Sequence, residues 1–294
     1  MMLKSQSHNI IAAMSPFFMA SLLAWLAIDW RLTEQEKIPL DFWLTEQTLL
    51  PVNPMSAGEL ERYFDEHNYA WLPPLGATVP PYAVVKLPQD LSTMNDVKRK
   101  KALFFRALLP IVLAENKNIR QQRKKVINLM QKKSDLLSVV ERDWLNELGL
   151  WYRVSGDFNE SKVWHELLKR VDEIPAAIVL AQAANESAWG TSRFARLGNN
   201  LFGMWTSDEK NGMIPVRRDE GLRHALRVYP DVQASIRSYL RNLNTHRAYR
   251  HLRKLRHTAR KRGELVSAVK LVAGLRSYSI RGEAYVMEIR SMIR

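Results

Sequence analysis

The feature that most constrains this chain is an apolar stretch that begins after Pro175 and ends at one acidic residue, Glu186. Residues 176–184 carry no charged side chain, and most of them are small or apolar. A proline suits the first turn of a helix, and a helix that is apolar on nearly every side belongs in a core. The stretch is too short to span a bilayer. We therefore expect a buried helix that stops near Gly190.

Glu186 is expected where this helix leaves the interior, between Asn185 and Ser187 and close to the indole of Trp189. A carboxyl group against an indole ring is poorly solvated when it is ionised, so its pKa should rise. A carboxyl that stays protonated near neutral pH has the property that a general acid needs to protonate a glycosidic oxygen. The plain alternative is a local cap or salt bridge, the usual role of a glutamate near a helix end.

The residues that follow extend the pattern to NESAWGTSRFARLGNNLFGMW, from Asn185 to Trp205. This run resembles the signature of the glucosaminidase family (glycoside hydrolase family 73), whose pattern is close to ESxWGxS followed by NNLFG. The resemblance covers the chain from about Val171 to the C-terminus. It includes a tail, residues 278–285, that is similar to the family's Bax-like branch. It implies a lysozyme-like domain in which Glu186 is the proton donor.

The resemblance also implies residues that bind the substrate near this acid. Tyrosine suits a sugar site because its ring offers an apolar face to pyranose C–H groups and its hydroxyl offers a polar tip. Core packing or turn formation stays open as the role of each residue taken alone. The expected substrate-binding residues are Trp189, Asn199, Asn200, Phe202, Tyr229, Tyr239 and Tyr249.

Residues 204–229 form the region with a strand pattern. Segments 213–216 and 222–228 flank a turn at 219–221, which predicts a β-hairpin lobe. Members of the family often carry a second acidic residue in such a lobe, and Glu220 is the first candidate here. The other acids of this region are Asp208, Glu209 and Asp219. Alternatively, all of them are solvated and the substrate's own N-acetyl group assists the reaction.

The N-terminal segment predicts a membrane anchor. Residues 9–28 carry no charged side chain and are long enough to cross a hydrocarbon core. The positive charge of Lys4 ahead of them favours an N-in orientation. The small-x-small rule for signal cleavage fails at Ala24 and Ala27. We therefore expect an uncleaved signal anchor over residues 1–30.

Three further segments follow the anchor. Residues 31–90 are rich in proline and are predicted to be a linker, with one helix whose first turn holds Ser56 and Glu59 in capping-box spacing. Whether this linker also packs on the later domain stays open. Residues 91–170 have a helical period, with a kink or break expected at Pro110, and form a lead-in packed on the catalytic domain. Residues 171–294 are the glucosaminidase domain.

The net charge of +14, from 44 Lys and Arg against 30 Asp and Glu, favours a polyanionic partner. Nucleic acid is not expected, because the basic runs at 98–101 and 120–125 look like solvated helix faces and no nucleic-acid signature accompanies them. The basic run 247–262 is either such a face or an aid to capture of an acidic cell wall. The chain has no cysteine and its histidines lack HExxH spacing, so no metal or cofactor is expected.

These inferences combine into a mainly α, α+β fold: a lysozyme-like domain with a small β-hairpin lobe, preceded by a transmembrane helix and a Pro-rich linker. The expected protein is a peptidoglycan hydrolase, an endo-β-N-acetylglucosaminidase that binds glycan strands. It would be anchored in the bacterial inner membrane with its catalytic domain in the periplasm. The alternatives are a non-catalytic peptidoglycan-binding or scaffolding protein of the envelope, and a membrane-anchored nucleic-acid binder with steep salt dependence.

Overall fold

The computed structural model describes residues 49–74, 76–132, 134–210, 212–215 and 225–294. The expected signal anchor and the first part of the expected linker lie outside these residues. Across the described ranges, no helix combines the length and the apolar character that a membrane crossing requires. The described chain is mainly helical with two small sheets, which confirms the predicted α+β class.

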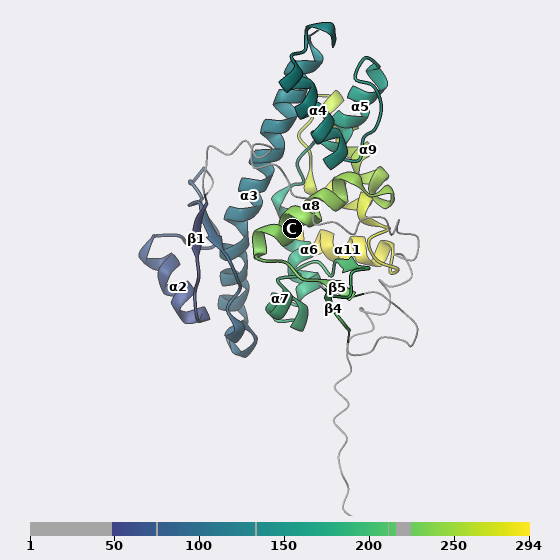
Figure 1. Ribbon diagram of the computed structural model, residues 1–294. Helices are drawn as coiled ribbons and strands as arrows, with labels where there is room; N and C mark the ends of the chain where they lie inside the picture. The colour runs from purple at the N-terminus through teal and green to yellow at the C-terminus, as the bar shows by residue number, and fades with distance from the viewer. Residues whose placement is uncertain (1–48, 75, 133, 211, 216–224) are drawn as a thin grey trace, which may run out of the picture.

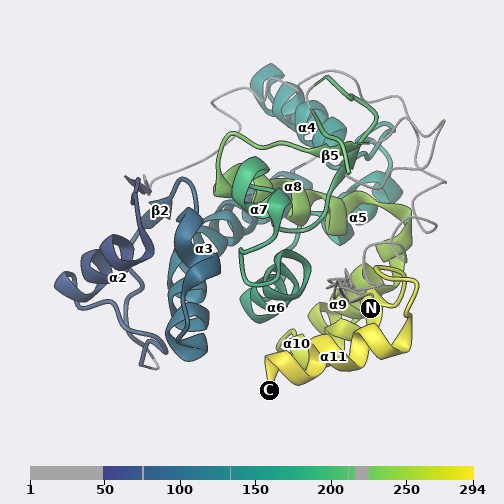
Figure 2. The ribbon, with the colours of Figure 1, turned by 90° about the horizontal axis from the view of Figure 1, so that it is seen from below.

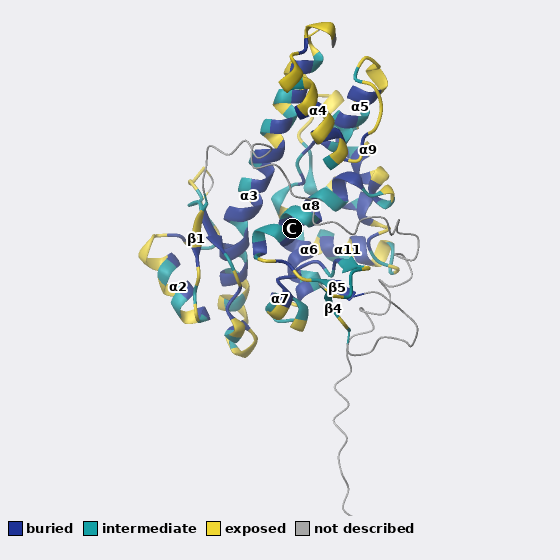
Figure 3. Ribbon diagram, viewed as in Figure 1, coloured by how far each residue is buried: buried dark blue, intermediate teal, exposed yellow. Residues whose placement is uncertain are grey.

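Helices make up most of the molecule, and α6 lies at its centre beside α3, α8 and α11 (Figures 1 and 2). Buried residues run through these helices, whereas exposed residues gather at the outer ends of α3, α4 and α5 (Figure 3). The α-helices are α2 (Ala57–Glu66), α3 (Val97–Met130), α4 (Val139–Trp151), α5 (Ser161–Arg170), α6 (Ala176–Ser187), α7 (Arg193–Gly198), α8 (Val232–Thr245), α9 (Arg250–Lys261), α10 (Ala268–Leu271) and α11 (Glu283–Ile293). The 3-10 helices are η2 (Gln89–Thr93), η3 (Ser134–Leu136), η4 (Arg247–Tyr249) and η5 (Val272–Leu275).

Helix α3 is a 34-residue rod with α2 on one side of it and α6 on the other (Figure 1). Asp96 caps its first turn by accepting a hydrogen bond from the Arg99 N–H at 3.0 Å. The sequence predicts a kink or a break at Pro110; the helix continues through this residue, so the break is wrong. An interior proline removes one backbone hydrogen bond. The helix persists because the residues on both sides of Pro110, including Leu108 and Ile111, are buried in the same core.

The predicted linker contains folded structure in its described half. Strand β1 (Leu50–Val52) pairs in parallel with β2 (Tyr82–Val84), and helix α2 lies between them in the sequence. As predicted, Ser56 caps α2, because its hydroxyl accepts from the Glu59 N–H at 3.1 Å. The Glu59 carboxylate completes a variant of the predicted box by accepting from the N–H of the residue before the cap, at 2.8 Å.

This N-terminal unit packs on the rest of the chain. Leu60, Phe64 and Val84 are buried, and the backbone N–H of Val232 in α8 donates to the carbonyl of Val85 at 3.0 Å. The described part of residues 31–90 therefore packs on the later domain, a question that the sequence left open. The apolar and aromatic side chains between the prolines are numerous enough to build their own contact with α3.

The small sheet forms in the predicted strand region. Its order is β3 (Trp205–Thr206), β5 (Ala225–Arg227) and β4 (Gly212–Met213), with both pairings antiparallel. The two strands that flank the expected turn do pair, although each is shorter than predicted, and β3 adds a third strand. The turn itself, with Glu220, lies outside the described residues.

Asp172 lies in the loop before α6, and guanidinium groups from α3 and α9 surround its carboxylate. Its buried carboxylate lies 3.0 Å from Arg260, 3.6 Å from Arg256 and 3.7 Å from Arg123. The wholly buried side chain of Arg256 also donates to backbone carbonyls near the N-terminus of α6. A plain solvated face is therefore wrong for Arg123 and Arg256, whereas Arg260 stays exposed while it contacts Asp172. They hold α3 and α9 against the loop that starts the central helix.

Candidate active site

Helix α6 ends at Ser187, three residues before the stop that the sequence predicted at Gly190. Ala188, Trp189 and Gly190 follow with φ of 50°, 60° and 78°, all in the left-handed region. The buried Ser187 hydroxyl donates to the carbonyl one helical turn earlier at 2.6 Å and accepts from the Gly190 N–H at 2.7 Å. Such a side chain competes with the helix for backbone partners and ends it early. Glu186 therefore sits in the last turn of the core helix.

Burial raises the pKa of Glu186 from 4.5 to about 7. Two donors to its Oε1 oppose this rise: the Tyr285 hydroxyl at 2.8 Å and the Asn185 amide at 3.2 Å. The negative charge of Glu288 raises the pKa further, and the positive charge of Arg281 lowers it. Near neutral pH a large share of the carboxyl groups therefore still carries a proton, which agrees with the rise expected from the sequence.

Tyrosine side chains surround this carboxyl. Burial raises the pKa of Tyr239, Tyr249, Tyr278 and Tyr285, and the nearby charge of Glu186 raises each of them further. The rings of Tyr278 and Tyr285 stack with centroids 5.4 Å apart and planes 6° apart. These hydroxyls stay protonated at neutral pH and can serve as hydrogen-bond donors. The cluster joins α8, η4 and α11 around the end of α6.

The indole of Trp189 points to another part of the core. It packs edge-on against Phe104 and Phe105 of α3, with centroids 5.9 Å and 5.1 Å away, and the Lys101 ammonium lies 4.6 Å from the ring centroid. The tyrosine cluster, and not this indole, therefore surrounds the Glu186 carboxyl, which differs from the expectation drawn from the sequence. Trp189 is half-buried, and contact with substrate stays a prediction for it.

Asn199 and Asn200 are buried and bonded to the backbone of the small lobe. The Asn200 amide donates to the Met204 and Arg227 carbonyls at 2.8 Å and 2.9 Å, and its oxygen accepts from the Met204 N–H at 2.9 Å. Asn199 donates to the Tyr229 carbonyl at 3.0 Å. Asn200 thus ties the loop after α7 to strand β5, and Asn199 ties it to the segment that follows this strand. Direct contact with substrate stays a prediction for both.

The other expected aromatic residues lie within the cluster or at its edge. Phe202 stacks on Tyr239 with centroids 3.9 Å apart, and its carbonyl accepts from the Tyr278 hydroxyl at 3.1 Å. The Tyr229 hydroxyl donates to Ser238 at 2.8 Å. Tyr239 thus lies near Glu186 with Phe202 stacked on it, and Tyr229 lies near Tyr278 at the edge of the cluster. Their buried rings shape the surroundings of the carboxyl.

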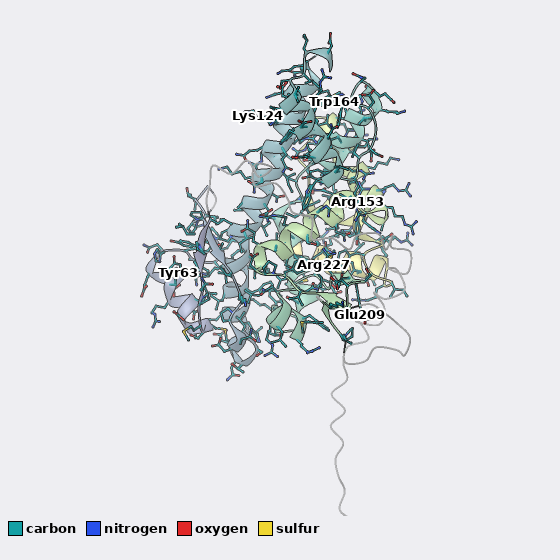
Figure 4. All side chains as sticks on the ribbon, in the orientation of Figure 1. Tyr63, Lys124, Arg153, Trp164, Glu209 and Arg227 are labelled. Atoms are coloured by element: carbon teal, nitrogen blue, oxygen red, sulfur yellow. The ribbon has the colours of Figure 1, made fainter. Side chains whose placement is uncertain are left out.

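The structure describes two of the four candidates for the second acidic group expected in the lobe, Asp208 and Glu209. Asp208 accepts from the Lys210 N–H at 3.1 Å and so stabilises a turn. Glu209 lies at the rim of the small sheet, farther from the centre of the molecule than Arg227 (Figure 4). Asp219 and Glu220 lie outside the described residues, so their predicted role is untested.

Sequence reasoning did not identify several residues that lie near Glu186, most of them from a distant segment of the chain. Tyr285 and Glu288 are three residues apart on α11 and so share one face, which Arg281 extends by an ion pair with Glu288 at 2.7 Å. Gln182 lies one turn before Glu186 on α6 and donates to Tyr285. The sequence signal that could have identified Gln182 is its position four residues before the candidate acid Glu186. Among the described residues, no three histidine or acidic side chains are grouped closely enough to hold a metal ion.

A mainly helical domain that combines a half-buried, protonatable carboxyl with a small sheet has the parts of a glycoside hydrolase. The glucosaminidase family model, described as mannosyl-glycoprotein endo-beta-N-acetylglucosaminidase, matches residues 162–294. Protein bax of Escherichia coli (strain K12) is 36% identical over 200 residues, which cover 68% of this chain and 70% of that protein. No solved structure shows a significant match. The chain therefore belongs to the glucosaminidase family, in its Bax-like branch, and so to the glycoside hydrolases.

Proposed function

We propose that this protein is a peptidoglycan hydrolase, an endo-β-N-acetylglucosaminidase that cleaves the β-1,4 bond after N-acetylglucosamine. The observation that carries the proposal is the Glu186 carboxyl, whose pKa rises to about 7 through burial within the segment that matches the family. A general acid works best when its pKa lies near the working pH. Glu186 meets that condition, whereas a solvated glutamate would be ionised.

In the proposed reaction Glu186 donates its proton to the glycosidic oxygen as the bond from that oxygen to the anomeric carbon breaks. The proton leaves with the departing sugar as its new hydroxyl, and Glu186 becomes a carboxylate. The anomeric carbon acquires oxocarbenium-like positive charge and then forms a bond to the oxygen of a water molecule. The proton that this water releases restores the neutral acid of Glu186, directly or through solvent. Either Glu220 in the lobe or the N-acetyl group of the substrate itself stabilises that positive charge.

The charge of the protein supports an acidic polymer as substrate. The net charge of +14 attracts polyanions over a distance of about one Debye length, roughly 8 Å at physiological salt. Peptidoglycan carries carboxylates on its stem peptides, so it fits this field better than a neutral glycan. We place the protein in the bacterial inner membrane through residues 9–28, with the catalytic domain facing the periplasm.

Mass analysis of purified sacculi digested with the full chain tests the bond that is cut. We expect the new reducing ends to carry N-acetylglucosamine, because the proposed cut follows that sugar. Reducing ends on N-acetylmuramic acid would contradict the proposed specificity while leaving a glycoside hydrolase in place.

A scaffolding role is the second candidate, and Asp208 favours it, since one oxygen of this carboxylate already accepts from the Lys210 N–H in a turn. Sacculus pelleting separates the two candidates. Full binding with no release of soluble fragments at any pH between 5 and 8 would support the scaffold and overturn the hydrolase.

A further inference from the structure

A chain of hydrogen bonds connects three helices and ends on Glu186. Tyr239 of α8 donates to the Gln182 carbonyl oxygen on α6. The Gln182 amide nitrogen donates to the Tyr285 hydroxyl of α11 at 2.7 Å, and that hydroxyl donates to Glu186 Oε1 at 2.8 Å. Gln182 and Tyr239 are wholly buried and Tyr285 is 2% exposed. Water therefore does not compete for the first two bonds, and the third ends on the half-buried carboxyl of Glu186.

The direction of this chain follows from the chemistry of its members. An amide oxygen only accepts and an amide nitrogen only donates, whereas a tyrosine hydroxyl has one proton to give. Because the Tyr285 oxygen accepts from Gln182, its own proton is directed at Glu186. Gln182 and Glu186 lie four residues apart on α6, so they share one face and both reach Tyr285.

The same geometry decides which carboxyl oxygen carries the transferable proton. Glu186 Oε1 receives both the Tyr285 hydroxyl and the Asn185 amide, which leaves that oxygen little capacity to hold a proton of its own. Within the part of the chain that the structure describes, no hydrogen bond reaches Oε2. The proton of the neutral acid therefore belongs on Oε2.

We propose that Gln182 and Tyr285 are positioning residues for the acid: they fix the plane of the Glu186 carboxyl and keep its proton on Oε2, ready for the glycosidic oxygen. Tyr239 completes the set by orienting the Gln182 amide. This inference rests on the proposed function, since it deepens the role of Glu186 in that reaction. It adds two residues outside the signature motif, drawn from the interior of α6 and from α11.

The test is Tyr285→Phe, assayed by the release of soluble fragments from sacculi across pH 5 to 9. We expect kcat to fall about 10-fold to 100-fold, because a displaced reacting group loses that much. KM should not change, because the Tyr285 hydroxyl is buried against protein groups. The alkaline limb of the kcat profile should move to higher pH, because the lost donor stabilised the ionised form of Glu186.

Gln182→Met serves as a second variant that removes the bond orienting Tyr285 while keeping the volume of the side chain. We expect a smaller fall in kcat with the same upward movement of the alkaline limb. Tyr152→Phe is the matched control, because the Tyr152 hydroxyl is also buried and donates to the amide oxygen of Gln122 at 2.9 Å. This control should leave kcat and the position of the alkaline limb unchanged, even where it lowers the free energy of unfolding as much as Tyr285→Phe does.

Two results overturn the inference. One is Tyr285→Phe with unchanged kcat and an unmoved limb. The other is an alkaline limb that moves to lower pH, which would mean that the hydroxyl accepts the proton of Glu186 instead of donating to it. Failure of the proposed function looks different, because Glu186→Gln would then retain activity.

Discussion

Glu186→Gln is expected to reduce fragment release from sacculi by about 100-fold or more, the usual contribution of a general acid. The amide keeps the shape of the side chain, and its oxygen can still accept from the Tyr285 hydroxyl. It has no proton to transfer to a glycosidic oxygen at any pH in the working range. Initial rates with purified sacculi, followed by soluble fragment yield, measure the effect.

Glu283→Gln is the matched control for this substitution, since Glu283 is an exposed residue at the start of α11. It should leave the rate unchanged. Glu186→Gln should also keep full binding to sacculi and a cooperative unfolding transition, which separates lost chemistry from lost structure. A variant that keeps more than about half of the wild-type rate would remove Glu186 from the mechanism, because no other proton donor is assigned.

Asp172→Asn should lower the free energy of unfolding by about 3–5 kcal/mol, the typical result of removing one partner from a buried ion pair. The substitution leaves Arg256 wholly buried without its carboxylate and weakens the contacts of Arg123 and Arg260. Burial already lowers the pKa of Arg256 to about 10, while the charge of Asp172 opposes that fall. Urea or guanidinium unfolding measures the loss.

The control for Asp172 is Glu61→Gln, which breaks an ion pair with the largely exposed Arg99. Exposed pairs contribute about 0–1 kcal/mol, so this variant should stay close to the wild type. Equal losses in the two variants would mean that Asp172 is not the anchor of the α3 and α9 arginines.

The parts of the fold that the sequence predicts well depend on interactions between residues close together in the chain. The charge-free run before Glu186 predicts a buried helix because side-chain composition alone decides whether a helix has a solvent face. Ser56 with Glu59 predicts the start of α2 because a capping box acts within one turn. The pairing of β4 with β5 follows from a turn signal between two short apolar segments.

Long-range partners explain what the sequence does not predict. Tyr285 lies 99 residues after Glu186, so no spacing rule connects the hydroxyl to the carboxyl. Arg123 and Arg256 follow helical periods that are typical of exposed faces, and only the position of Asp172 makes them interior. The sequence does not predict the parallel strand pair in the proline-rich segment, because the partners β1 and β2 are about 30 residues apart and each is three residues long.

The central claim is that Glu186 holds a proton near neutral pH, and a titration of its side-chain carboxyl tests that claim most directly. Carbon NMR of glutamate-labelled protein, compared between the wild type and Glu186→Gln, identifies the resonance that belongs to Glu186. We predict a midpoint near pH 7, as burial of the carboxyl requires. A midpoint near 4.3, the ordinary value of a solvated glutamate, would contradict the account.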